Sequence, residues 1–406
     1  MRTAAIAIVG GGVVGASVAY HLAARGVRDI LILERGAHPG EGSTGVATGG
    51  YRASFATPID VRLSLLARES LRRFRDETGV DPEYVPIGYL WLAAHEKEMR
   101  ALREALAVQH AEGLPETALV DPGEIARLNP WVRAAEGGDA GFVGGLFCPT
   151  DGVLRPMKIL EGYLSAAARA GVTIEYGVQV TGVVREGDDA AQGETDRSGR
   201  IVRLETTQGP LEVGSVVNAA GAWAGSLAAL AGIVLPVTPL RRQVAVTEPF
   251  AAIPESMPLT IYAADGFHFR LCDGRVLLLW PDSPLGRAER ADPFDRRVDP
   301  DWVAAVAEEA RRRVPVLASA AIDTAACRAG LYEMSPDRHA ILGAAPDCPN
   351  FYLANGSSGH GVMHAPALGL LLAEIVTTGE ARSLDVAPLR PSRFAEGGIE
   401  GSVELL

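Results

Sequence analysis

The amino-terminal segment places the strongest constraint on the fold. Residues 4–9 (AAIAIV) form a continuous apolar run, which is typical of a strand buried on both faces. The glycine-rich segment 10–15 (GGGVVG) follows at once, and apolar residues then recur at helical spacing as far as Gly26. A second apolar run at 29–33 (DILIL) ends at Glu34. A strand, a glycine-rich turn, a helix and a second strand in this order predict the βαβ unit of a Rossmann-like fold.

The spacing inside this unit predicts a bound dinucleotide. Gly10 permits the tight turn, Gly12 lets the backbone approach a pyrophosphate, and Gly15 lets the helix lie close to the strand. Glu34 lies about twenty residues after the last glycine, where a carboxylate accepts from a ribose hydroxyl. The alternative is a glycine-rich turn that binds nothing, and the acid at the expected place argues against it. The predicted contacts here are Gly10, Gly12, Val13, Val14, Gly15, Glu34 and Arg35.

Composition limits the class of protein. The chain has 406 residues, 48% of them hydrophobic, which is too long for one ordinary core and indicates two domains or one domain with a large insertion. Its formal net charge of −12 argues against a nucleic-acid partner, because phosphate binding needs a basic surface. The four cysteines are far apart and lack paired spacing, so we expect buried reduced thiols and no metal site.

No targeting or membrane segment is expected. The first predicted strand begins by residue 4, with no signal peptide before it. The longest apolar run, 365–376, contains Glu374 and is too short to cross a bilayer. We therefore expect a cytoplasmic protein without a membrane span.

After the second strand the pattern departs from a nicotinamide-binding Rossmann domain, which continues with further βα units. Residues 40–52 (GEGSTGVATGGYR) are small and polar instead. Ser43 and Thr44 can donate their hydroxyls to a pyrophosphate, and glycines such as Gly49 let the backbone lie near a flat ring. A plain surface loop is the alternative for this segment.

The middle of the chain contains further strands. Residues 172–184 alternate like a strand pair and 200–207 like a third strand, which predicts a three-stranded meander. Residues 216–225 (VVNAAGAWAG) follow as a buried strand that breaks into small residues. A dinucleotide-binding half-domain interrupted by a meander is how two-dinucleotide-fold flavoproteins are built.

These motifs together resemble the D-amino-acid-oxidase-like (DAO) superfamily of FAD-dependent oxidoreductases, in its sarcosine oxidase and glycine oxidase branch. They occur in the expected order along almost the whole chain. The motifs that carry the resemblance are GGGVVG at 10–15, LILERG at 31–36, GSTGVATGGYR at 42–52, VVNAAGAWAG at 216–225, GLYEMSPDRHAILG at 330–343 and NGSSGHGVMHAP at 355–366.

The resemblance implies an α/β fold in which a two-dinucleotide-binding, Rossmann-like FAD domain carries a discontinuous, mostly antiparallel β-sheet substrate domain. The FAD domain is expected over 1–85, 150–235 and 330–406, and the substrate domain over 86–149 and 236–329. Within the latter, the sequence predicts strands at 240–248, 260–263, 267–271 and 276–280 and a helix at 302–314.

The resemblance also implies the flavin contacts. In the family the segment that matches 356–361 approaches the flavin pyrimidine ring, and the helix after it points its amino terminus at the N1–O2 edge. Reduced flavin is negative there, so free backbone N–H groups and the helix dipole stabilise it. A glycine hinge before a core helix is the alternative. The further contacts expected are Val180, Ala220, Gly221, Trp223, Gly330, Gly359, His360, Gly361, Val362 and Met363.

On the substrate side the resemblance assigns catalytic positions to Arg52, Tyr332 and His360. Relatives of the monomeric sarcosine oxidase type hold the substrate carboxylate with an arginine that matches Arg52 and a lysine that matches Met363. Half of that carboxylate clamp is therefore missing, which puts sarcosine itself in doubt. For His360, ring packing and catalysis stay equally open. The substrate contacts expected are Arg52, Tyr262, His268, Arg270, Tyr332 and Met363, with Arg242 as a further possible replacement for the lysine.

Two departures bear on flavin attachment and the electron acceptor. Some relatives bond the flavin to a cysteine at the position of Gly330, and others to a histidine near the loop 40–52, which contains none. Non-covalent FAD is therefore expected. The segment 276–282 lacks the lysine that activates oxygen in the monomeric oxidases, which favours another acceptor, although an arginine can supply the same charge.

The resemblance predicts FAD-dependent oxidation of a C–N bond in an amino acid or a secondary or N-methyl amine. A hydride would pass to flavin N5 and the imine would hydrolyse in water. Two alternatives share these motifs: the flavin subunit of a hetero-oligomeric amine dehydrogenase that needs partner subunits, and a non-catalytic FAD-binding scaffold or assembly factor.

Overall fold

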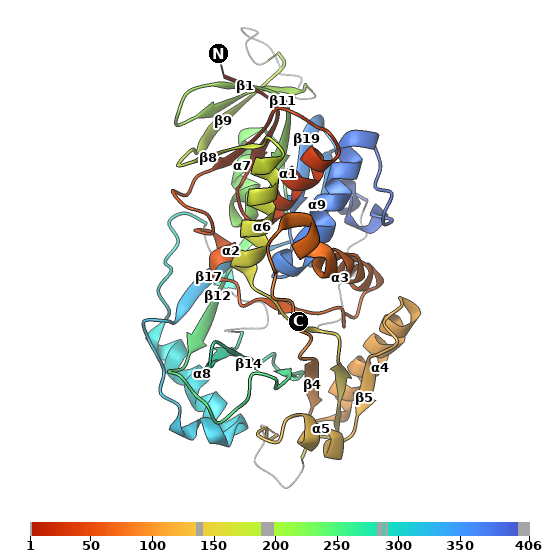
Figure 1. The fold of residues 1–406 in the computed structure, drawn as a ribbon, viewed down its shortest axis with the longest axis vertical. Helices are drawn as coiled ribbons and strands as arrows, with labels where there is room; N and C mark the ends of the chain where they lie inside the picture. The colour runs from red at the N-terminus through yellow and green to blue at the C-terminus, as the bar shows by residue number, and fades with distance from the viewer. Residues whose placement is uncertain (1, 135–140, 188–198, 282–286, 289–290, 397–406) are drawn as a thin grey trace.

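The computed structural model describes residues 2–134, 141–187, 199–281, 287–288 and 291–396, which form two large β-sheets (Figure 1). The first sheet contains β1 (Arg2–Val9), β2 (Ile30–Glu34), β8 (Thr173–Tyr176), β9 (Val180–Arg185), β10 (Ile201–Thr206), β11 (Leu211–Asn218), β18 (Ile341–Ala345) and β19 (Cys348–Asn355). The second contains β4 (Tyr89–Ala93), β5 (Ala118–Val120), β6 (Gly144–Cys148), β12 (Thr238–Val246), β13 (Leu259–Tyr262), β14 (His268–Cys272), β15 (Arg275–Leu279), β16 (Arg287–Ala288) and β17 (Arg328–Met334).

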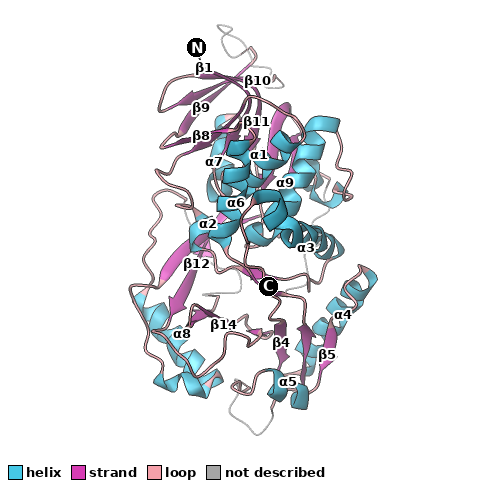
Figure 2. Ribbon diagram, viewed as in Figure 1, coloured by secondary structure: helices cyan, strands magenta, loops and turns pink. Residues whose placement is uncertain are grey.

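Helices accompany both sheets, as the cyan ribbons of Figure 2 show. They are α1 (Val13–Ala24), α2 (Ser43–Val46), α3 (Pro58–Thr78), α4 (Glu96–Ala111), α5 (Pro122–Leu128), α6 (Pro156–Arg169), α7 (Ala224–Leu230), α8 (Pro300–Arg313) and α9 (Gly361–Thr378). In the view of Figure 1, α1, α6, α7 and α9 lie beside the first sheet, while α4, α5 and α8 lie beside the second. A short pair, β3 (Gly50–Tyr51) with β7 (Gly152–Val153), forms a third, two-stranded sheet.

The centre of the first sheet is parallel and buried on both faces. Its strands run in the order β18-β19-β11-β1-β2-β8, and Ile6 and Ile8 of β1 lie opposite Ile30 and Ile32 of β2. These isoleucines enter the core formed with α1, α3, α6 and α9. Alternate residues such as Ala7 enter the other core, with α7, because successive side chains of a strand point to opposite faces.

Two glycines let helices approach their neighbours closely. A Cβ on Gly15 of α1 would lie 2.0 Å from the carbonyl oxygen of Gly10, and one on Gly369 of α9 would lie 2.1 Å from Ser17 Oγ. Helix α9 has the length and hydropathy of a membrane span, but 61% of that window is buried inside the protein. It is therefore the core helix of the first half, packed on α1 and α3.

The second sheet runs in the order β16-β12-β15-β14-β13-β4-β6-β5, and β17 pairs with β12. All its pairings are antiparallel except that of β13 with β4, which confirms the expected mostly antiparallel sheet. β12, β13, β14, β15 and α8 lie within two residues of the predicted elements.

The structure corrects the predicted meander. β8 pairs in parallel with β2, whereas the antiparallel ribbon consists of β9, β10 and β11. Gly177, with φ of +69°, turns the chain between β8 and β9. The alternation at 172–184 is compatible with either partner, because a local pattern does not say which strand lies alongside.

The expected boundary at residue 330 falls inside β17, which belongs to the second sheet as far as Met334. The expected limits between the FAD domain and the substrate domain therefore stay a prediction. Residues 397–406 of the expected FAD domain lie outside the described residues.

Candidate active site

A cavity of about 1270 Å³ is lined by residues of both sheets. From the first half come the end of β1, the start of α1, the end of β2, the segment 40–50 and the start of α9. From the second come side chains of β12, β13, β14 and β17. A ligand pocket for one drug-sized molecule holds roughly 300–1,000 Å³, so this volume accommodates a dinucleotide together with a small substrate.

The glycine-rich turn forms one end of the cavity from bare backbone. Gly10 has φ of +112°, and a Cβ there would lie 2.3 Å from the carbonyl oxygen of Ala219. Gly12 is the N-cap of α1 and supplies no side-chain cap, so the start of the helix lines the cavity with Val13 and Val14. Glu34 accepts from the N–H of Gly11 at 2.8 Å and from the N–H of Gly36 at 2.7 Å. This end fits a ribose and a pyrophosphate.

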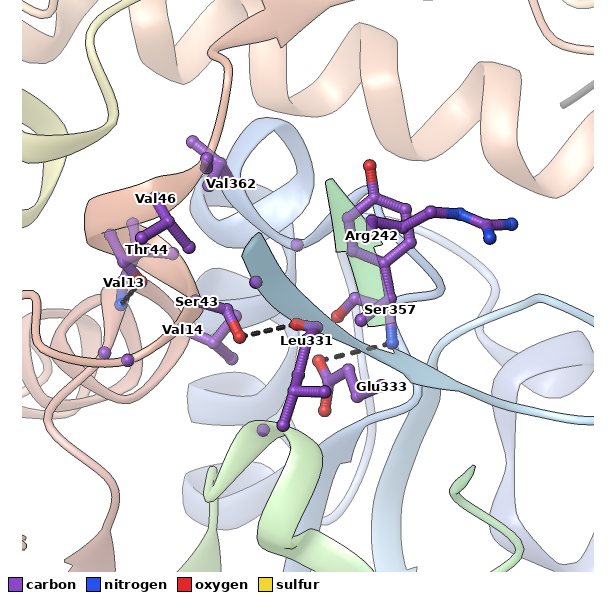
Figure 3. Close-up of a pocket in the computed structure, with 18 of the residues that line it drawn as sticks. Val13, Val14, Ser43, Thr44, Val46, Arg242, Leu331, Glu333, Ser357 and Val362 are labelled. Carbon is purple, nitrogen blue, oxygen red and sulfur yellow. Dashed lines mark hydrogen bonds between the residues drawn. The ribbon is translucent and has the colours of Figure 1, made fainter. Parts of the chain in front are cut away.

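Ser43 and Thr44 of α2 line the same end of the cavity, and their hydroxyls form hydrogen bonds to other elements of the protein (Figure 3). Ser43 Oγ donates to the carbonyl of Leu331 on β17 at 2.6 Å. Thr44 Oγ1 accepts from the N–H of Val13 at 3.2 Å. The segment is therefore not a plain surface loop: it ties α1 to β17 across the cavity.

The start of α9 forms another wall. Gly361, Val362 and Met363 line the cavity, and the N-cap His360 gives the helix no side-chain cap. Gly359 has φ of +91°, and a Cβ there would lie 2.6 Å from the ring of Tyr332. The ring of Tyr332 thus requires a glycine at position 359. The lack of side chains here also leaves the amino terminus of α9 open to the cavity.

Arg52 is a buried cation in the cavity, with 5% of its surface exposed. Its guanidinium lies over the ring of Phe55 at 4.2 Å and over Trp91 at 5.2 Å. Its Nη2 lies 3.2 Å from Nε2 of His360. Since a guanidinium only donates, Nε2 is the acceptor. Burial, and then the charge of Arg52, hold the pKa of His360 well below its usual range, so the ring is neutral.

The face of the second sheet adds further polar groups. Arg242 on β12 and both His268 and Arg270 on β14 line the cavity. Burial lowers the pKa of His268 to about 4, so its charge is absent at neutral pH. Tyr332 on β17 is half-buried and lines the cavity, and burial raises the pKa of its phenol, which therefore keeps its proton.

Glu333 is a carboxyl group that sequence reasoning missed. It lines the cavity beside Ser357, whose N–H donates to Oε1 at 3.3 Å, while Oε2 is buried without a partner among the described residues (Figure 3). Burial raises its pKa to about 7. The one sequence signal for Glu333 was its position directly after Tyr332 in GLYEMSPD. Strand alternation argues against this signal, because it places neighbouring side chains on opposite faces, yet both residues line the cavity.

Two predicted contacts lie outside the cavity. Gly15 serves the packing of α1, as its proposed role in the turn implies. The expectation for Tyr262 is wrong: its hydroxyl donates to the carbonyls of Arg133 and Arg313, and its ring lies in the core beside Phe267. Its neighbour Ile261 faces the cavity instead, because strand side chains alternate.

The other predicted contacts all line the cavity, while their roles stay predictions. They are Gly10, Gly12, Val13, Val14, Glu34, Arg35, Ser43, Thr44, Gly49, Arg52, Val180, Ala220, Gly221, Trp223, His268, Arg270, Gly330, Tyr332, Gly359, His360, Gly361, Val362 and Met363. Sequence reasoning also missed Asp292, which binds Arg35 through two hydrogen bonds of 2.9 and 3.1 Å and lines the cavity. No local pattern marks such a long-range pair.

Comparison with known proteins agrees with this geometry. The FAD dependent oxidoreductase (DAO) family model matches residues 5–375. The chain is 31% identical to FAD-dependent oxidoreductase domain-containing protein 1 of Bos taurus, over 97% of this chain and 85% of that one. It is 29% identical to glycine oxidase of Geobacillus kaustophilus, over 97% and 98%.

Among solved structures, L-proline dehydrogenase from P. horikoshii superposes with a TM-score of 0.84 at 26% identity, covering 98% of this chain and 99% of that one. The glycine cradle, the acid at the end of β2 and the open start of α9 fit the FAD that members of this family bind. The chain is a member of the DAO family of FAD-dependent oxidoreductases.

Proposed function

We propose that this chain oxidises the C–N bond of an amine or amino acid that carries a carboxylate. The observation that carries the proposal is Arg52, a buried guanidinium on the wall of the cofactor cavity. A buried cation at that place binds a carboxylate well, because the interaction is charge-assisted and shielded from water. Glycine oxidase and L-proline dehydrogenase, which resemble this chain, are named for substrates of that kind.

The side chains around Arg52 bind and orient the substrate. FAD held by the glycine-rich turn and the start of α9 would supply the electron acceptor for removal of a hydride from the carbon next to nitrogen, and hydrolysis of the resulting imine by water would follow. His360 accepts from Nη2 of Arg52, and Phe55 lies under the guanidinium, so the cation is held in one orientation. The neutral phenol of Tyr332 can donate a hydrogen bond to the substrate.

No strong base is required in this scheme. The lone pair of the unprotonated amine drives hydride loss, so the cavity must select the neutral nitrogen. The positive charge of Arg52 favours that form, because it raises the free energy of a nearby ammonium group.

Anaerobic flavin bleaching tests the proposal without assuming an electron acceptor. Sarcosine, dimethylglycine, proline and D-amino acids should be mixed singly with the protein, and loss of the flavin absorbance followed. Bleaching by at least one carboxylate-bearing amine is expected. If no amine bleaches the flavin, the scaffold alternative gains and oxidation of small amino acids is contradicted.

Reoxidation of the bleached protein identifies the acceptor. Reoxidation by oxygen that keeps pace with turnover, with stoichiometric hydrogen peroxide, identifies an oxidase. Slow reoxidation beside fast turnover with a dye identifies a dehydrogenase, which the lysine-free segment 276–282 favours. A dehydrogenase that turns over only with co-purified chains would be the subunit of a larger assembly.

The same preparation shows how the flavin is attached. No cysteine lines the cavity among the described residues, and a Cβ on Gly330 would lie 2.6 Å from Val46. Acid precipitation should therefore release all of the flavin, and flavin retained in the pellet would show a covalent bond.

A further inference from the structure

Arg270 is a second buried cation in the cavity, and the proposed reaction leaves it unused. It lies on β14, lines the cavity and has 4% of its surface exposed. Among the described residues its guanidinium has no hydrogen bond or ion pair, and its Nε is buried without an acceptor. An unpaired buried charge is strongly destabilising, so such a group indicates an anion that arrives from outside the chain.

The neighbours of Arg270 cannot serve as that anion. Leu277 on β15 lies directly opposite in the sheet, and Leu259 on β13 lines the same wall. Three acidic groups act on Arg270 electrostatically, Cys272, Tyr89 and Asp273, and only Asp273 is a carboxylate. This carboxylate is already bound by Arg155, whose Nη1 donates to Oδ2 at 2.8 Å and whose Nη2 donates to Oδ1.

Arg270 and Arg52 act on the same part of the cavity. Both guanidinia oppose the rise that burial causes in the pKa of Tyr89, so both lie within electrostatic range of this cavity-lining phenol. The glycine-rich turn, which would hold the FAD pyrophosphate, belongs to the other sheet. Arg270 thus belongs to the half of the cavity that receives substrate.

We propose that the substrate is an amine with two carboxylates, one bound by Arg52 and the other by Arg270. The inference rests on the proposed function and narrows its substrate class. With an unprotonated nitrogen such a molecule carries two negative charges, which complement two buried guanidinia. An amine with a single carboxylate, bound by Arg52, would leave Arg270 without a partner among the described residues.

Binding of non-reacting acids tests the second carboxylate directly. Succinate and glutarate should perturb the flavin absorbance of the holoenzyme with a Kd about 10- to 100-fold lower than butyrate, as one added charge-assisted hydrogen-bonded pair provides. Arg270→Met, of similar length and without charge, should remove that advantage while butyrate binds as before. Arg241→Met is the matched control, since Arg241 lies on β12 outside the cavity and donates to the carbonyl of Arg297.

Anaerobic bleaching gives the second readout. Iminodiacetate and N-methylaspartate should reduce the flavin with at least tenfold higher efficiency than sarcosine and N-methylalanine. In Arg270→Met the two diacids should lose that factor, and the two monoacids should change by less than twofold. If Arg270→Met does not retain flavin, Arg270→Lys and the diacid preference of the wild type decide.

Three results would overturn the inference. The first is equal Kd values for butyrate and the diacids, and the second is a diacid preference that survives Arg270→Met. The third is an Arg270→Met variant in which only reoxidation by oxygen slows, because Arg270 would then act on the electron acceptor and not on the substrate. The proposed function fails separately: tight succinate binding without bleaching by any amine would keep the diacid site and contradict the oxidation.

Discussion

The two ends of the cavity are built from different material. At the glycine-rich turn the walls are backbone, because Gly10 and Gly12 bring peptide groups and the start of α1 to the cavity. Along the second sheet the walls are side chains, among them Arg242 and Arg270. Backbone donors are fixed by the fold and suit a ligand shared by a whole family, whereas side chains can be exchanged singly and suit a ligand that differs between members.

The largest expected effect breaks the backbone end. Gly10→Ala would place a Cβ 2.3 Å from the carbonyl oxygen of Ala219 on a residue with φ of +112°. We expect loss of bound flavin and a destabilisation of about 3 kcal/mol or more, from strain and clash together. Gly26→Ala is the matched control: its φ is +86°, and nothing lies within 4 Å of the added Cβ. That variant should cost about 1 kcal/mol and keep its flavin. Flavin absorbance and melting temperature report both, and full flavin occupancy in Gly10→Ala would contradict the role of this turn.

The second effect breaks the side-chain end and leaves the first intact. Arg52→Met should lower kcat/KM for a carboxylate-bearing amine about 30-fold or more, because a buried charge-assisted pair contributes roughly 2–4 kcal/mol. Flavin content should not change. Arg62→Met is the control, since Arg62 forms an exposed ion pair with Glu112. An unchanged kcat/KM in Arg52→Met would place the substrate carboxylate elsewhere.

The third effect concerns pH. It sharpens the contrast between the backbone end and the side-chain end of the cavity, since side chains such as Glu333 titrate and backbone groups do not. Glu333 keeps its proton in the folded protein up to about pH 7, whereas in the unfolded chain it ionises near its ordinary value of 4.5. The free energy of unfolding of the wild type should therefore fall, relative to Glu333→Gln, as the pH rises from 4.5 to 7, by up to about 3 kcal/mol. Melting temperatures of both proteins between pH 5 and 9 measure the difference. A constant difference over that range would show that Glu333 does not titrate there.

The smallest effect tests the link between the two ends. Ser43→Ala removes the hydroxyl that donates to the Leu331 carbonyl at 2.6 Å. We expect a loss of about 1 kcal/mol in stability, as for one internal hydrogen bond, with flavin retained. Loss of flavin as complete as in Gly10→Ala would mean that this hydroxyl binds the cofactor itself.

The same contrast explains what the sequence could predict. The glycine-rich turn, Glu34 and the start of α9 could be predicted from the sequence, because each depends on residues close together in the chain. The partner of β8, the position of the Tyr262 ring in the core and the pair of Arg35 with Asp292 could not be predicted. Strand pairing and the choice of sheet face are set by distant residues, and a one-residue error in phase moves a side chain from the cavity to the core.

Strand β17 constrains how the cavity can open. It is hydrogen-bonded in the second sheet, yet the Leu331 carbonyl accepts from Ser43, the Glu333 carbonyl accepts from the N–H of Ser358, and Arg328 donates to the Val46 carbonyl. The strand is therefore anchored to the flavin-binding half on two sides. A rigid hinge motion of the whole second sheet would break all of these bonds at once. Any opening of the cavity that keeps these hydrogen bonds must therefore leave β17 in place.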